Sequence, residues 1–311
     1  MLQPSSLTET PREAIATPKP AFLTDDSVAA LRFAADALSA GMAAALVTLV
    51  EIRGGAARSP GAQMVVREDG VYCGFVSGGC VEAAAACEAL DAIRTGADRT
   101  VIYGKGSPWF DIVLPCGGGI TLCIHLLRSA APLLTVLGAL ERRDPMGLRY
   151  NPHDQTLLPV SDINKTGWHN GMFDVSYRPC VRALIYGRSV ESEATVKLAQ
   201  AAGYNVQIGD TPARTTLIDV DTAVVLLYHD LHRELPALEA ALNAAPFYIG
   251  ALGSQRTHQQ RVLTLRERGF AATDIARIKA PIGLFPKARD ARSLALSVLA
   301  DVAAARLQSQ T

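Results

Sequence analysis

The strongest constraint on the fold is a regular alternation of short apolar runs and helical stretches after residue 181. The runs RALIYG, NVQIGD and TAVVLLY have strand length, and helical or turn sequence separates them. Parallel strands need crossover connections of this kind, which are usually helices. The pattern therefore predicts that residues 181–311 form a Rossmann-like domain with a doubly wound parallel sheet.

Residues 25–130 follow a different pattern and predict an α+β domain. Asp26 or Ser27 can cap an amphipathic helix that runs to about Ser39, and an alanine-rich helix is expected from Val81 to near Gly96. The turn residues Asp69 and Gly70 predict a β-hairpin. The expected strands are 44–52, 63–67, 71–75, 100–103 and 119–127. The chain as a whole is expected to be an α/β protein.

Two segments lack a regular pattern. Residues 1–24 are rich in Pro, Ser and Thr and are expected to form a flexible tail. Between residues 131 and 180, prolines, glycines and asparagines interrupt the periodicity, and only hairpin-like fragments are expected. We therefore predict that 131–180 connect the two domains.

Charge and cysteine content exclude several classes of protein. Thirty basic and thirty acidic residues give a formal net charge of zero, so no overall field attracts nucleic acid or anionic lipid. No apolar run is long enough to span a membrane, and no stretch resembles a signal peptide. We therefore expect a cytoplasmic protein whose six cysteines are thiols.

The first candidate site is the segment SGGCVE, Ser77 to Glu82, at a predicted strand-to-helix turn. Gly78 and Gly79 precede Cys80 there, so free backbone N–H groups and the positive end of a helix would face one point. A thiol at such a point is a better nucleophile or soft-metal ligand than an ordinary cysteine. The alternative is a small residue packed beneath a tight turn.

A second cysteine has similar surroundings. In LPCGGG, a proline precedes Cys116, and Gly117 and Gly118 allow another stretch of backbone to approach closely. Each motif alone is explained by a turn, but packing has no need for two glycine-flanked cysteines in one domain. Cys80 and Cys116 are therefore predicted to share a pocket and to be its candidate metal ligands.

A loop that precedes both motifs in the sequence carries groups that bind phosphate. Arg58 supplies a guanidinium and Ser59 a hydroxyl just before the predicted hairpin, and Arg53 lies a few residues earlier. The alternative interpretation for both arginines is a solvated loop side chain.

The second domain has a modified dinucleotide fingerprint. Its first strand ends in YGRSVES, which keeps Gly187 but reads GxSxxS where GxGxxG binds a pyrophosphate, and this argues against NAD(P). Asp210 follows the next strand at about the spacing expected for a ribose-binding carboxylate, although a helix cap is equally consistent. Arg256 opens a basic helix after a glycine turn and is a candidate anion ligand, whereas Arg261, Arg266 and Arg268 of the same helix are expected to be solvated.

The motifs GGAARSPGAQMVV, DGVYCGFVSGGCVEAA and LPCGGG resemble, in order, the XdhC/CoxI family of accessory proteins for molybdenum hydroxylases such as xanthine dehydrogenase. YHDLHRELPAL and YIGALGSQRTHQQR resemble the Rossmann domain of that family. The resemblance extends from about residue 25 to the end. It implies a site that includes these residues: Arg58, Ser59, Ser77, Gly78, Gly79, Cys80, Glu82, Cys116, Gly117, Gly118, Gly187, Asp210 and Arg256.

What the resemblance implies is a chaperone rather than an enzyme. Family members bind molybdenum cofactor, protect it during maturation, including its sulfuration, and pass it to a molybdenum hydroxylase apoenzyme. The expected partners are thus that apoenzyme and a sulfuration partner, and a homodimer is compatible with the sequence. The competing hypotheses are a nicotinamide-dependent oxidoreductase that uses the second domain, and an adaptor that binds only proteins.

Overall fold

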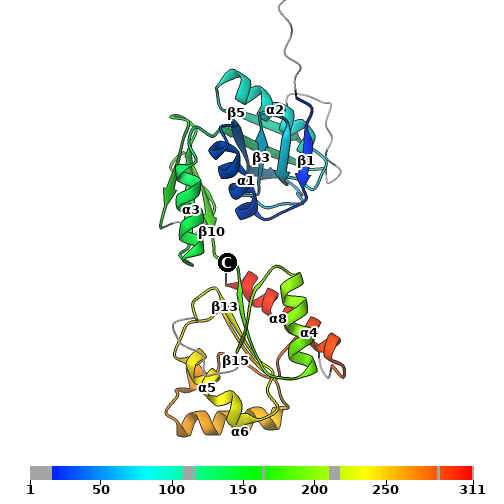
Figure 1. Cartoon of the computed structure of the whole chain (residues 1–311), viewed down its shortest axis with the longest axis vertical. Helices are drawn as coiled ribbons and strands as arrows, with labels where there is room; N and C mark the ends of the chain where they lie inside the picture. Colours follow the sequence, from blue (N-terminus) through cyan, green and yellow to red (C-terminus); the bar gives the residue numbers. More distant parts are fainter. Residues whose placement is uncertain are drawn as a thin grey trace, which may run out of the picture. The chain divides into compact units, whose positions relative to one another are not determined.

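The computed structural model describes residues 16–107, 114, 117–162, 165–209, 218–285 and 288–309. The chain divides into two compact units, with Arg178 the last residue of unit 1 and Pro179 the first residue of unit 2. Figure 1 shows the helices and strands of each unit. The α/β class expected from the sequence is confirmed.

Unit 1 is built on a six-stranded sheet with the order β1-β4-β3-β2-β6-β5, in which only β1 and β4 pair in parallel. The helices and strands expected over residues 25–130 all form. They are α1 (Ser27–Ser39), β2 (Ala44–Arg53), β3 (Gln63–Arg67), β4 (Val71–Gly74), α2 (Glu82–Thr95), β5 (Arg99–Gly104) and β6 (Gly119–Leu126).

The helix boundaries follow the capping chemistry that the sequence predicts. Asp26 precedes α1, and its carboxylate accepts a hydrogen bond from the backbone N–H of Val28 at 2.9 Å. Gly96 ends α2 in the left-handed conformation, with φ of 69°. These two ends fix helices that pack on opposite faces of the sheet, as the two separate clusters of buried side chains in unit 1 require.

Two expectations about unit 1 differ from the structure. Part of the segment expected to be a tail, Lys19–Phe22, forms the exposed edge strand β1. The expected connector, 131–180, instead contains a helix and a four-stranded antiparallel sheet with the order β8-β7-β10-β9. These elements are α3 (Ala131–Glu141), β7 (Met146–Asn151), β8 (Thr156–Val160), β9 (Gly167–His169) and β10 (Met172–Tyr177).

The sequence pattern missed the sheet in residues 131–180 because its strands are short and their apolar side chains are buried against other parts of unit 1. Leu148, Phe173 and Tyr177 are buried in the same cluster as Leu31 of α1 and Leu46 of β2. Local periodicity cannot reveal a face that is buried by residues a hundred positions away. The segment therefore belongs to unit 1 and does not act as a spacer.

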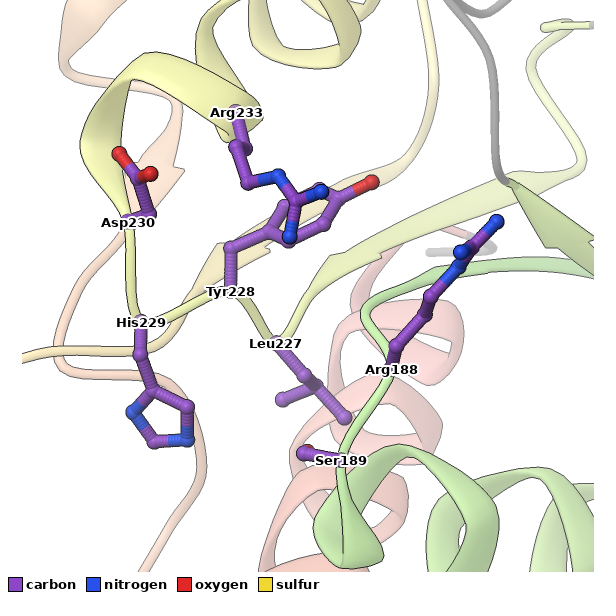
Figure 2. Close-up of a pocket in the computed structure, with 7 residues that line it drawn as sticks. All are labelled: Arg188, Ser189, Leu227, Tyr228, His229, Asp230 and Arg233. Atoms are coloured by element: carbon purple, nitrogen blue, oxygen red, sulfur yellow. The ribbon is translucent and has the colours of Figure 1, made fainter.

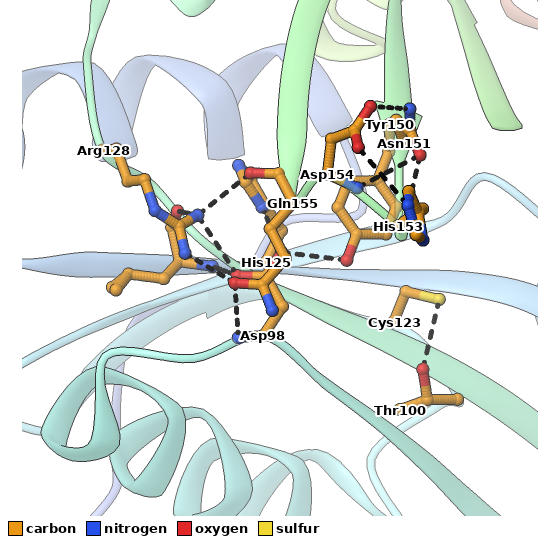
Figure 3. A network of polar contacts seen from close by, with 11 residues as sticks. Asp98, Thr100, Cys123, His125, Arg128, Tyr150, Asn151, His153, Asp154 and Gln155 are labelled. Carbon is orange, nitrogen blue, oxygen red and sulfur yellow. Dashed lines mark hydrogen bonds and ion pairs between the residues drawn. The ribbon is translucent and has the colours of Figure 1, made fainter.

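A polar network also ties the two sheets of unit 1 together (Figure 3). Asp98, which is 4% exposed, accepts from the hydroxyl of Tyr150 in β7 at 2.9 Å and lies 2.6 Å from Nδ1 of His125 in β6. Arg128 donates to the Asp98 carboxylate and to the Gln155 side chain. Burial raises the pKa of Asp98, but the hydrogen bonds from His125, Leu126 and Tyr150 outweigh it, so the net pKa is lowered.

Unit 2 contains the parallel sheet predicted from the alternating pattern. Its strand order is β12-β11-β13-β14-β15, and all four pairings are parallel. The order 2-1-3-4-5 is the flavodoxin-like form of the doubly wound fold. The strands are β11 (Arg182–Tyr186), β12 (Asn205–Gly209), β13 (Thr222–Leu226), β14 (Tyr248–Ala251) and β15 (Ile278–Lys279).

Helices cover both faces of this sheet. Side chains of α5 and α6 are buried with one face, and side chains of α4 and α8 with the other. The helices are α4 (Val190–Ala201), α5 (Leu231–Leu242), α6 (Gln255–Glu267), α7 (Ala272–Ile275) and α8 (Ala291–Gln308). Within the described ranges, none of the helices combines the length and apolar character that a membrane crossing demands.

Candidate functional site

The strand register of unit 1 brings the predicted motifs to one edge of the six-stranded sheet. Gly119, the first residue of β6, lies opposite both Arg53, the last residue of β2, and Gly104, the last residue of β5. Gly74 at the end of β4 pairs with Met64 near the start of β3. The segments that follow β2 (54–62), β4 (75–81) and β5 (105–107), and the glycines 117–118 that precede β6, therefore all lie at the same edge, which we call the loop edge.

Glycines allow the backbone of these loops to pack closely. A Cβ atom on Gly118 would lie 2.1 Å from the carbonyl oxygen of Gly55, and one on Gly104 would lie 2.4 Å from that of Gly118. No other residue fits at either position without moving the backbone. The close approach that the glycines of LPCGGG predict is thus present, and its partner is the loop that follows β2.

The backbone N–H groups of the SGGC turn bind the side-chain carboxylate of Glu82. Glu82, the first residue of α2, is 2% exposed, and its side chain folds back into the turn. It accepts hydrogen bonds from the backbone N–H groups of Val76 (3.1 Å), Ser77 (2.8 Å), Gly78 (3.3 Å), Gly79 (2.9 Å) and Val81 (3.2 Å). The Ser77 hydroxyl donates to both carboxylate oxygens.

This arrangement corrects one prediction from the sequence. The backbone N–H groups of the turn were expected to be free for a ligand anion, but the Glu82 carboxylate takes them up. Burial raises the pKa of Glu82, yet the hydrogen bonds from Ser77 and Gly78 outweigh it and leave the pKa below its usual range. Glu82 is therefore an ionised structural group, and its negative charge opposes a second anion at the same point.

Cys80 is the side chain that the turn presents to solvent. Its thiol is exposed, and its only described partner is the Ser77 hydroxyl, at 3.4 Å from Sγ. Gly79 before it has φ of 107°, a conformation that glycine adopts at little cost. In contrast, Cys73 is buried in β4, and burial raises its pKa to about 12. Of these two thiols, only Cys80 is available to a ligand.

The two loop arginines have different surroundings. The guanidinium of Arg58 donates to the carboxylate and to the carbonyl oxygen of Asp25, both at 2.9 Å, so it is held against the start of α1. Arg53 donates from Nε to the carbonyl oxygen of Lys105 at 2.8 Å and from Nη1 to the Glu51 carboxylate and the Thr121 hydroxyl, and only its Nη2 is buried without a hydrogen-bond partner among the described residues. A buried donor without an acceptor is costly, so Arg53 has unused capacity for an anion. Ser59 is exposed.

Two of the predicted ligands lie outside the described residues. Cys116 and Asp210 belong to this group, although Leu114 and Gly117, on either side of Pro115 and Cys116, are described. The predicted meeting of Cys80 and Cys116 therefore stays a prediction. Among the described residues, no group of three or more His, Cys, Asp or Glu side chains is arranged to hold a metal ion.

In unit 2, the turn after β11 is crowded by its own chain. A Cβ atom on Gly187 would lie 2.4 Å from the Ser192 hydroxyl and 2.7 Å from the Leu227 carbonyl oxygen, which explains the glycine. Ser189 caps α4 by accepting from the backbone N–H of Ser192 at 3.3 Å. Glu191 and Glu193 in the first turn of α4 place negative charge where a dinucleotide fold binds its pyrophosphate.

A buried ion pair dominates the motifs after β13 and β14. Arg261 is fully buried, and its guanidinium forms a two-point contact with Glu234, which is 1% exposed. Arg261 also donates to the carbonyl oxygen of Leu252 at 2.8 Å. The sequence predicted a solvated Arg261 because helical position alone does not show which face is buried. Arg256 on the same helix is exposed.

These placements separate structural from available residues. Glu82 and Arg261 are buried and hold neighbouring backbone in place. Cys80, Arg53 and Arg256 keep capacity to bind. In GGCVE the glutamate stands three residues after the second glycine. This spacing is the sequence signal that would have identified Glu82 as the hydrogen-bond acceptor for the backbone N–H groups of the turn.

Family models match both units of the chain. The model described as the XdhC and CoxI family matches residues 37–104, and the one described as the XdhC Rossmann domain matches residues 183–302. The first range contains the SGGC turn and the second contains the ion pair of Glu234 and Arg261.

Similar proteins span nearly the whole chain. The molybdenum cofactor insertion chaperone PaoD of Escherichia coli K12 is 62% identical over 295 residues, which cover 94% of this chain and 93% of PaoD. The uncharacterized protein YqeB of the same organism is 28% identical over 83% of the chain but 42% of its own length. A crystal structure described as a xanthine dehydrogenase from Bacillus halodurans shares the fold, with a TM-score of 0.71, 20% identity and coverage of 90% and 96%. The chain belongs to the XdhC and CoxI family.

Proposed function

We propose that this protein is a molybdenum cofactor insertion chaperone that delivers the cofactor to a molybdenum hydroxylase apoenzyme. The observation that carries the proposal is the 62% identity to PaoD over 94% of the chain.

The geometry of the loop edge supports a holding role. The Cys80 thiol is exposed on a turn that Glu82 stabilises from below, so the thiol can contact a ligand without any rearrangement of the backbone. Thiolates suit soft metal centres, and the cofactor supplies such a centre together with its dithiolene. Arg53 is ion-paired with Glu51 through Nη1, and its Nη2, which has no hydrogen-bond partner among the described residues, is proposed as a donor for an anionic group at the loop edge.

Cys116, Gly117 and Gly118 are proposed to complete this site. Gly118 packs directly on the loop after β2, so its motif joins the loop edge. Arg58 is proposed to act by fixing the loop before β3 to α1, since Asp25 occupies its guanidinium. A sulfuration partner and a homodimer remain proposals for the complete maturation complex.

The test is the molybdenum content of protein purified from a molybdenum-replete host. We expect Cys80→Ser to lower bound molybdenum and oxidised pterin by tenfold or more, because the soft ligand is removed while the turn is kept. Cys87→Ser is the matched control, because the Cys87 thiol is also exposed but lies within α2 and outside the SGGC turn. This variant should retain both the molybdenum and the pterin. Equal retention by the two variants would rule out the Cys80 role.

A second measurement tests delivery. Cofactor-loaded protein is mixed with an apo molybdenum hydroxylase, and activity is followed against the same amount of free cofactor. Faster or more complete activation by the loaded protein supports the proposal. If free cofactor activates the apoenzyme equally well, the chaperone function is wrong.

A further inference from the structure

The loop that follows β2 contacts two separate parts of unit 1. A Cβ atom on Gly78 of the SGGC turn would lie 3.2 Å from the Cβ atom of Ala57. Near the other end of the same loop, a Cβ atom on Gly61 would lie 2.6 Å from Cγ2 of Thr166, the residue before β9. The loop therefore connects the SGGC turn to β9, which is an edge strand of the four-stranded sheet.

The strand β9 carries a large aromatic side chain close to this contact. Trp168 is two residues from Thr166, so their Cα atoms are at most about 7 Å apart. Trp168 lies opposite Phe173 of β10, which lies opposite Tyr150 of β7, so the three side chains share one face of the sheet. Phe173 and Tyr150 are 1% and 8% exposed, whereas Trp168 is 46% exposed. This row of aromatic side chains therefore ends in an indole that is open to solvent beside the loop after β2.

The contact between Trp168 and Phe173 leaves room for a second aromatic partner. The ring centroids are 5.2 Å apart and the ring planes are inclined at 69°, which is an edge-to-face arrangement. In this arrangement Phe173 covers at most one of the two faces of the indole. A planar heteroaromatic ring can stack on a face that Phe173 does not cover.

The positions of these contacts suit a single elongated ligand. Ala57 and Gly61 are four residues apart, so their Cα atoms are separated by at most about 14 Å. Molybdenum cofactor combines a dithiolene, which holds the metal, with a pterin, which is a planar heteroaromatic ring system. The exposed thiol of Cys80 is available to the metal at one end of the loop, and the indole of Trp168 is available to the pterin at the other.

We propose that Trp168 stacks on the pterin ring of the bound cofactor and holds the end of the molecule that lies away from Cys80. The inference rests on the proposed function, because it concerns how the same site binds its cargo. Stacking also removes the exposed apolar surface of the indole from water, which favours binding.

The first test is hydroxyl-radical labelling of Trp168, located by mass spectrometry of peptides. The unmodified chain is labelled after purification from a molybdenum-replete host and from a host that makes no pterin cofactor. We expect about fivefold less labelling of Trp168 in the cofactor-loaded form, because a stacked ring excludes solvent from the indole. Leu158, which is 57% exposed on the opposite edge strand β8, is the internal control and should be labelled equally in both forms. A decrease at Trp168 of less than about twofold in fully loaded protein would overturn the proposal.

Variants separate stacking from packing. Trp168→Leu keeps an apolar side chain next to Phe173 but has no aromatic face, so it should lower the copurified pterin by about fivefold or more. Trp168→Phe keeps an aromatic face and should retain pterin to within about twofold of the unmodified chain. Leu158→Ala is the matched control and should retain all of it, and melting temperatures of the cofactor-free variants show whether each one folds. Equal pterin content in Trp168→Leu and the unmodified chain would contradict the stacking role, as would equal losses in the two Trp168 variants.

Failure of this inference can be distinguished from failure of the proposed function. A chain that copurifies with neither molybdenum nor pterin contradicts both the chaperone function and the stacking role. A chain that carries the cofactor but shows the same labelling of Trp168 in both forms contradicts the stacking role alone.

Discussion

The two units each bury one glutamate in the first turn of a helix, and they stabilise it in different ways. In unit 1, Glu82 accepts hydrogen bonds from neutral backbone N–H groups and a hydroxyl. In unit 2, Glu234 is paired with the guanidinium of Arg261, which is itself fully buried. The first glutamate stabilises a local turn, whereas the second connects the consecutive helices α5 and α6 through a residue 27 positions away.

In both units a residue close to the buried glutamate is exposed. Cys80 stands two positions before Glu82 and is exposed. Arg233 stands one position before Glu234, is exposed, and lines a cavity at the carboxyl ends of β11 and β13 (Figure 2). The buried carboxylate holds the backbone, and the neighbouring side chain points outward. Motifs of this kind therefore combine a buried structural residue and an exposed residue within a few positions.

The largest expected effect comes from breaking the ion pair. Arg261→Leu should lower the free energy of unfolding of unit 2 by about 3–5 kcal/mol, because it leaves the Glu234 carboxylate buried without its partner. Hydrogen exchange of amides in β13 and β14 measures this loss. Replacing both residues by leucine should cost clearly less, and an equal cost would mean that the pair is not the cause.

A smaller loss is expected from the glutamate of unit 1. Glu82→Gln keeps the size of the side chain but directs an amide N–H₂ group at backbone donors, so we expect a loss of about 2–3 kcal/mol. Urea unfolding followed by the fluorescence of Trp168 measures it. Glu141→Gln, at an exposed carboxylate in α3, is the control and should change stability by less than about 0.5 kcal/mol.

The pH dependence of stability should distinguish Glu82 from an ordinary surface acid. Its pKa in the folded chain lies below the usual 4.5, so its contribution is complete above that value and is lost as the pH falls through the folded pKa. The unfolding midpoint of unit 1 should therefore decrease on acidification below about pH 5. The decrease should be smaller in Glu82→Gln, and an identical decrease in both chains would show that other carboxylates account for it.

The smallest effects on stability are expected at Cys80 and Arg233, the exposed residues close to the two buried glutamates. Cys80→Ser and Arg233→Ala should each change the free energy of unfolding by less than about 0.5 kcal/mol, because both side chains are exposed. Thermal unfolding of each variant against the unmodified chain measures this. A loss above about 2 kcal/mol at either position would mean that the side chain stabilises the fold. It would contradict the assignment of Cys80 and Arg233 as residues without a structural role.

Sequence patterns predicted the elements of the fold well where the elements are locally encoded. The cap at Asp26, the turn at Gly70 and the alternation after residue 181 led directly to α1, the β3–β4 hairpin and the parallel sheet. The sheet formed by residues 146–177 was missed because its buried face depends on α1 and β2, which local periodicity does not contain.

The site was predicted less completely than the fold. The sequence located Cys80 in a glycine turn, but it did not show that Glu82 fills that turn or that Arg58 is held by Asp25. Both outcomes depend on which way a charged side chain folds back, and many rotamers are compatible with the same sequence. Burial of Arg261 was missed for the same reason, since its partner lies 27 positions away.

The boundary after Arg178 has a consequence for how the chain can be divided in evolution or by design. Each of the four clusters of buried apolar side chains lies entirely within one unit. A gene split at this boundary would encode two polypeptides that each complete their own core. A split at residue 130 would instead separate α1 from the strands that cover it and leave Leu31 and Leu46 with an open apolar face.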